Sequence, residues 1–297
     1  MIKQINRLFV ASLVIITVLL AGPASAQTQI INNSGGNCAF NGETGGLRIH
    51  TSGNSQFQVE RCSANGSNSR ARQFFSSGQL PPSNFLFNSM YLRVGDEVFG
   101  SGNQAAGGGP DIPGLRLFRT VSASGGSTLG DGSSVAVYAA DLNGLTYTVT
   151  QTVSYIFPND FYTVDIQISV PAGNTQEVDF YSWTDLQLDG DDFGQCIQQN
   201  TFPRFAGGDN TARNYFAGYR ERDTALSWDT FYCGFYGLPT SAGTGAQALI
   251  SAPARNLPNT NDTSTTDIGA ATHWNVVDSG GASFRAQFDF ILSLIHI

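Results

Sequence analysis

Alternation of apolar and polar residues is the clearest pattern in this sequence. From Leu145 to Phe157 the odd positions are mostly apolar, whereas the even positions are mostly threonine or serine. From Tyr162 to Val170 the even positions are apolar instead, and the turn residues Pro158 to Asp160 separate the two segments. Because side chains alternate between the two faces of a strand, each segment is typical of a half-buried β-strand.

A third strand is predicted to follow a turn at Pro171 to Asn174. Its apolar side carries four residues, Val178, Phe180, Leu186 and Leu188. Because the three segments follow one another with short turns, they predict an antiparallel meander.

Two further hairpins are predicted. Residues 91–94 and 97–99 flank Gly95-Asp96, a loop that favours a tight hairpin. Near the end of the chain, residues 273–277 and 284–290 are expected to pair across a glycine-containing turn. Many strands separated by turns favour two packed sheets over α/β layers. We therefore predict an all-β fold: a large antiparallel β-sandwich, supersandwich-like, with long loops rich in Gly, Ser and Asn.

The two ends of the chain are interpreted as separate from this domain. A basic start, an apolar run from Leu8 to Ala21 and the small residues Ala24 to Ala26 are typical of a secretory signal peptide, so residues 1–26 are expected to be removed. The run is short for a membrane span. Residues 292–297 resemble the translation of an adapter from sequencing libraries, so the natural C-terminus is expected to be missing. Residues 27–291 then form a single all-β domain of an exported bacterial protein.

The net charge of the chain limits the kinds of molecule that it is expected to bind. The chain of 297 residues has a formal net charge of −8, and Lys3 is its only lysine. An acidic chain without a basic cluster does not fit a nucleic-acid partner or an anionic membrane surface.

The four cysteines are Cys38, Cys62, Cys196 and Cys233. Their spacing contains no C-x-x-C pair and so does not favour zinc. In an exported chain, two disulfides are expected. Of the three possible connectivities we prefer the local one, which joins Cys38 to Cys62 and Cys196 to Cys233.

An acidic cluster is the candidate metal site. Asp185, Asp189, Asp191 and Asp192 surround Gly190. Clustered carboxylates near a glycine turn can supply the oxygen ligands of Ca²⁺, although the spacing is a poor match to an EF-hand loop. The alternative is a solvated acidic turn.

The outward side of the same strand is the candidate ligand site. Tyr181 and Trp183 share it with Asp179 and Asp185. Aromatic rings beside carboxylates are typical of a sugar-binding surface, although a further layer of chain could instead cover Trp183. His273, on a predicted strand, is expected to face solvent, and no catalytic residues are assigned.

The region from Tyr91 to Phe290 resembles the extracellular β-sandwich domain of bacterial exported proteins with PEP-CTERM or IPTL-CTERM type sorting tails. The resemblance is carried by the meander from Leu145 to Val170, the acidic segment from Phe180 to Asp192, and the closing segments Asp267 to Gly269 and His273 to Asn275. It implies a cell-surface location, with anchoring through a tail that this sequence lacks. It brings no catalytic residues.

Two functions follow from these observations. The first is a secreted or cell-surface, non-catalytic module that binds a glycan or another surface or matrix component, or that is structural in the envelope. The alternative is a carbohydrate-active enzyme of lyase, epimerase or glycosidase type on a β-sandwich scaffold. An enzyme would require a cleft with two or more convergent titratable groups.

Overall fold

The computed structural model describes residues 29–33, 46–51, 55–61, 72–73, 88–100, 114–186, 188, 193–212, 215–235, 250, 255–276 and 280–293. Strands dominate these residues, and a short 3₁₀ helix, η1 (Thr224–Leu226), interrupts them. The predicted all-β, mainly antiparallel fold is confirmed. In this part of the chain, no helix has the length and apolarity that a membrane span requires.

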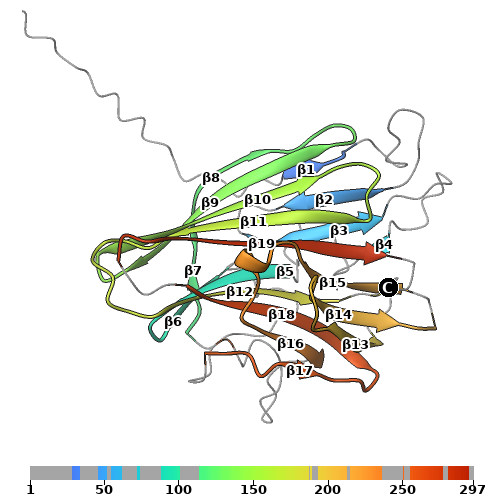
Figure 1. Cartoon of the computed structure of the whole chain (residues 1–297). Helices are drawn as coiled ribbons and strands as arrows, with labels where there is room; N and C mark the ends of the chain where they lie inside the picture. Colours follow the sequence, from blue (N-terminus) through green and yellow to red (C-terminus); the bar gives the residue numbers. More distant parts are fainter. Residues whose placement is uncertain are drawn as a thin grey trace, which may run out of the picture.

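The strands are hydrogen-bonded into one connected set, in which two layers, which we call sheet A and sheet B, can be distinguished (Figure 1). Sheet A has, in spatial order, β1 (Gln29–Ile31), β2 (Leu47–Thr51), β3 (Phe57–Arg61), β5 (Asn88–Val94), β12 (Val178–Asp185), β18 (Thr266–Val276), β16 (Thr230–Phe235) and β17 (Thr260–Asn261). At its margin lie β4 (Arg72–Gln73), β6 (Glu97–Gly100) and β7 (Arg116–Leu117).

Sheet B is a continuous antiparallel sheet. Its spatial order is β8 (Arg119–Gly125), β9 (Gly132–Leu142), β10 (Leu145–Tyr155), β11 (Phe161–Ser169), β19 (Ser283–Ser293), β15 (Tyr215–Glu221), β14 (Phe205–Asn210) and β13 (Phe193–Gln199). Figure 1 shows its long strands β9, β10, β11 and β19 running side by side.

The two sheets are joined at both margins. On one side, Phe193 and Gly194 of β13 pair with β18 of sheet A. On the other, the Ser127 amide donates to the Ile30 carbonyl, and the Asn33 amide donates to the Ser127 carbonyl. These links leave a flattened two-sheet body with one main apolar core between the sheets.

Burial follows the predicted alternation. In β10 the odd positions from Tyr147 to Tyr155 are buried, and in β11 the even positions are buried. The apolar side chains among them belong to the main core, and Gln151 is a polar residue buried in the same row. The hairpin of β5 and β6 is also confirmed: Val94 pairs with Glu97, and Gly95 takes a positive φ of 58°.

Two predicted pairings are wrong. β11 pairs with β10 and β19, whereas β12 lies in sheet A between β5 and β18. The chain therefore crosses between sheets after β11, and the three strands are not a meander. The predicted closing hairpin fails in the same way, because β18 belongs to sheet A and β19 to sheet B. Alternation assigns faces to a strand, but it does not identify the neighbouring strand.

One of the two predicted disulfides is present. Cys196 of β13 is bonded to Cys233 of β16, with a Cα–Cα distance of 5.7 Å. The bond therefore ties sheet B to sheet A. Cys38 and Cys62 lie outside the described residues, as does the predicted signal peptide, so these remain predictions. The boundary predicted at residue 291 falls inside β19, where Leu292 is buried in the main core.

Candidate functional site

The aromatic residues predicted to bind a ligand are covered in this structure. Tyr181 and Trp183 are exposed by 0% and 1%, respectively. They belong to a second apolar cluster, on the side of sheet A away from the main core, with Ile250, Leu257 and Tyr232 among its members. The alternative interpretation, in which a further layer of chain covers Trp183, therefore describes the structure.

The expectation that His273 faces solvent is wrong. Its side chain is fully buried: Nε2 lies 3.0 Å from Asp179 Oδ1, and Nδ1 lies 2.9 Å from Thr230 Oγ1. Asp179 also pairs with Arg255, and the Thr230 hydroxyl accepts the Leu257 amide. The order Thr–His–Asp is that of a hydrolase triad. Here, however, these bonds hold the covering layer to β12, as expected of a satisfied buried network.

The predicted Ca²⁺ site lies mostly outside the described residues. Asp189, Asp191 and Asp192 fall there, and Asp185 lies buried at the end of β12 opposite Gly269. Within the described ranges, no group of three or more His, Cys, Asp or Glu residues is arranged to hold a metal ion. The Ca²⁺ site therefore stays a prediction.

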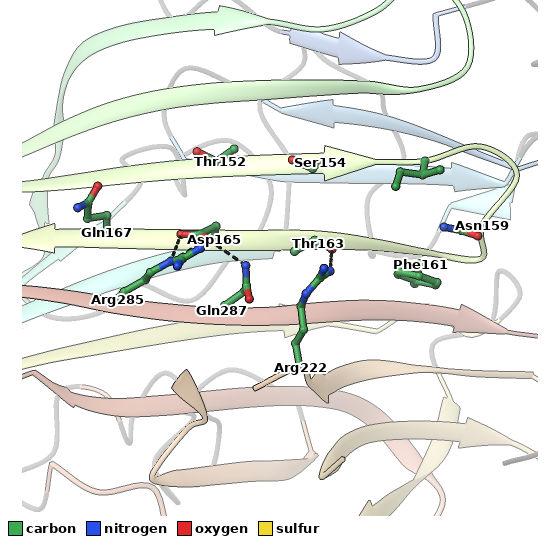
Figure 2. Close-up of a pocket in the computed structure, with 11 residues that line it drawn as sticks. Thr152, Ser154, Asn159, Phe161, Thr163, Asp165, Gln167, Arg222, Arg285 and Gln287 are labelled. Atoms are coloured by element: carbon green, nitrogen blue, oxygen red, sulfur yellow. Dashed lines mark hydrogen bonds and ion pairs between the residues drawn. The ribbon is translucent and has the colours of Figure 1, made fainter. Parts of the chain in front are cut away.

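An open groove lies on the outward face of sheet B, the face turned away from the core. Its volume is about 640 Å³. Figure 2 shows polar side chains rising into it from β10, β11 and β19 and from the segment after β15. The lining residues are Thr152, Ser154, Ile156, Asn159, Phe161, Thr163, Asp165, Gln167, Arg222, Arg285 and Gln287.

Asp165 is the centre of a hydrogen-bonded group on the groove floor. Arg285 donates from Nε to both carboxylate oxygens, at 3.1 and 3.0 Å, and also from Nη2. Gln287 Nε2 donates to Asp165 Oδ2 at 2.9 Å (Figure 2). The hydrogen bond with Asp165 is the main reason that the pKa of Arg285 is raised. This pairing holds the donors and acceptors of the floor at fixed positions.

A buried carboxylate fixes the next part of the groove. Asp289, exposed by 3%, accepts a hydrogen bond from the Thr163 hydroxyl at 2.8 Å. Arg222 Nη1 lies 3.1 Å from the same carboxylate, and Arg220 Nη2 lies 2.7 Å from it. Arg222 thereby reaches over Thr163 into the groove, although its own side chain remains 45% exposed.

Apolar surface bounds the groove at the β10–β11 turn. Phe161, half-buried, and Ile156, 62% exposed, both line it there. Arg220 packs against the Phe161 ring, with its guanidinium carbon 4.9 Å from the ring centroid. The groove therefore combines an aromatic side chain with hydroxyl, amide, guanidinium and carboxylate groups, which is the mixture that orients polyhydroxylated ligands.

The groove was missed at the level of sequence, although its signal is present there. The outward positions of three strands carry the polar residues Asp165 and Gln167, Arg285 and Gln287, and a run of hydroxyls that includes Thr152. Only the pairing of β19 with β11 shows that these rows are neighbours, since Asp165 pairs with Gln287 across more than a hundred residues.

The lining of the groove, among the described residues, includes one carboxylate. Asp165 is the carboxylate among the residues that line the groove, and it is already paired with Arg285 and Gln287. A glycosidase requires two carboxyl groups placed on either side of the scissile bond. The polar side chains of the groove can hold and orient a polar ligand.

Comparison with known proteins identifies a relationship of fold. No protein-family model and no curated protein sequence matches the chain. Among solved structures, it is similar to a bacterial glucoamylase complexed with acarbose, with a TM-score of 0.53 and 10% sequence identity. The similarity covers 91% of this chain and 32% of the glucoamylase, so the chain spans about a third of that protein's length. The protein is thus of an all-β, two-sheet class whose fold also occurs in that enzyme.

Proposed function

We propose that this protein is a secreted or cell-surface, non-catalytic β-sandwich module that binds a glycan in the open groove of sheet B. The observation that carries the proposal is the lining of the groove. Hydroxyl and amide groups from three strands surround the fixed Asp165–Arg285 pair, and Phe161 supplies an aromatic surface. These groups can pair with sugar hydroxyls and with the C–H faces of sugar rings.

Two further observations support the proposal. The neighbour in fold is a glucoamylase complexed with acarbose, which is compatible with a carbohydrate ligand. The Cys196–Cys233 disulfide is compatible with an oxidising compartment outside the cytoplasm. The resemblance to exported proteins with sorting tails agrees with the same location. A bacterial exterior is rich in polysaccharides, so a surface module with a polar groove has ready ligands there.

Affinity electrophoresis tests the proposal. The purified chain is run through gels that contain starch, xylan, laminarin, glycol chitin or alginate. We expect at least one polysaccharide to retard it. Arg285→Gln and Gln287→Ala should each weaken retardation about tenfold, because each removes hydrogen bonds that orient the ligand. Arg119→Gln is the matched control, because Arg119 makes a similar pair with Asp141 outside the groove.

The outcomes are distinct. Absence of retardation in every gel contradicts the proposal, and so does equal retardation of the wild type and both groove variants. Release of reducing sugar from a retained polysaccharide would instead favour the carbohydrate-active enzyme.

A further inference from the structure

A second cavity, which we call the aromatic recess, lies beside the groove on the same outward face. Its volume is about 340 Å³. The residues that line it are Asp160, Phe161, Gln199, Pro203, Phe205, Phe216, Arg220 and Ile291. Phe205, Phe216 and Ile291 are buried and form an apolar cluster of their own, separate from the main core. The solvent-facing side of an antiparallel sheet is normally polar, so this apolar floor is unusual.

Two glycines leave room for the floor. Gly207 of β14 and Gly218 of β15 are paired directly across the strands. A Cβ atom on Gly207 would lie 2.9 Å from Phe205 Cζ, and one on Gly218 would lie 2.8 Å from the same atom. The Phe205 ring therefore lies over bare backbone. A larger residue at either position would also clash with the facing backbone, since the added Cβ would lie 2.2 Å from Ala217 O or 2.5 Å from Ala206 O.

The recess and the groove share a wall. Phe161 lines both cavities. The buried Asp289 carboxylate holds Arg220, which lines the recess, and Arg222, which lines the groove. The Arg220 guanidinium also packs on the Phe161 ring. A ligand that fills the groove up to Phe161 thus meets the opening of the recess, with no intervening strand.

We propose that the recess is a second sugar subsite, and that the ligand is an oligosaccharide of at least two pyranose units. One unit lies in the polar groove, and the next places a C–H face on the aromatic floor, where Asp160 and Arg220 can pair with its hydroxyls. This inference rests on the proposed function of the groove. An apolar floor with a polar rim matches the two kinds of surface on a pyranose ring.

Titration calorimetry with oligosaccharides of defined length tests the subsite. The probes are the malto-, cello-, laminari- and chito-oligosaccharides from one to six units. In the series that binds, we expect affinity to rise about tenfold or more between the monosaccharide and the trisaccharide, which corresponds to one added stacking contact. Longer chains should gain little more.

A recess-filling variant separates the two cavities. The Gln199 side chain is half-buried and donates only to the Thr201 and Pro203 carbonyls, at 3.3 and 3.2 Å, among the bonds described for it. Gln199→Trp should occupy the recess and abolish the gain with length, while leaving monosaccharide affinity unchanged. Gln199→Ala is the matched control and should keep the gain. Thermal melting of both variants verifies that they are folded.

Each result of these experiments tests the recess proposal, the groove proposal or both. Equal affinity for all lengths overturns the subsite and leaves the groove proposal standing. A gain with length that survives in Gln199→Trp also overturns the subsite. A wild-type chain that binds none of the four series, and no polysaccharide in the gels, overturns both proposals.

Discussion

The outward faces of β12 and β11 make an instructive pair. Both strands are central in their sheets, but burial alternates along β11, whereas every position of β12 is buried. On β12 the outward Tyr181 and Trp183 are buried beneath a further layer that includes Leu257. On β11 the outward Thr163 and Asp165 form the floor of an open groove.

The composition of the outward face explains the difference. Aromatic side chains on the second face of a strand gain free energy when another layer covers them, because apolar area leaves water. Threonine, aspartate and glutamine gain little from being covered, so their face stays open. Outward aromatic residues on a central strand are thus compatible with a third layer as well as with a ligand platform.

The largest expected effect is a difference in stability between variants of the covered face and variants of the open face. Trp183→Ala should lower the free energy of unfolding by about 3–5 kcal/mol, the usual loss when a large buried side chain is truncated. Phe161→Ala, at a half-buried position, should cost much less but weaken glycan binding. Urea unfolding measures the first effect, and affinity electrophoresis measures the second. A stable Trp183→Ala protein that had lost glycan binding would place the ligand on β12 after all.

The ion pairs on the two faces should differ almost as much in how far they stabilise the folded protein. Asp179→Ala leaves His273 and Arg255 without their buried partner and should cost about 3–5 kcal/mol. Asp165→Ala removes a pair that lies in a solvent-accessible groove, where ion pairs contribute little to stability. Urea midpoints of the two variants give the comparison directly. Similar losses would show that the groove floor is as structural as the covered layer.

The disulfide that links the two sheets can be removed without changing either outward face. Replacing Cys196 and Cys233 together by alanine opens a loop of 37 residues and should cost about 3–4 kcal/mol on the chain-entropy model. We expect groove binding to persist, because the disulfide joins β13 to β16 at the far side of sheet B from β10. Chemical unfolding with and without reductant checks the first point. Unchanged stability would argue against the bond.

The smallest effect concerns alkaline pH. Burial, followed by the nearby Asp179 charge, raises the pKa of Tyr181 above its usual value near 10. The folded state then keeps the phenol neutral, so its contribution is complete below the unfolded pKa and is lost as pH rises toward the folded pKa. Tyr181→Phe should make the loss of stability above about pH 10 shallower by up to about 1.4 kcal/mol per pH unit. Unfolding curves at pH 9, 10 and 11 test this, and identical slopes would contradict it.

Much of the local structure could be predicted from the sequence. The inward rows of β10 and β11, the hairpin at Gly95 and the Cys196–Cys233 pair follow from alternation, turn residues and cysteine spacing. The groove could not be predicted, although the alternation along β10 and β11 assigns Thr152, Thr163 and Asp165 to the outward face. Its floor depends on Asp165 and Arg285 meeting across 120 positions of sequence.

The sequence by itself determined which side of each strand is apolar, because the period of two is a property of the strand alone. Only the tertiary structure decided which strands are neighbours, because many strands of similar pattern can satisfy one another's backbone hydrogen bonds. It also decided that His273 and Trp183 are buried, because a covering layer that includes Leu257 packs over them. The same long-range pairing placed Phe161 between two cavities and so created the site that we propose for an oligosaccharide.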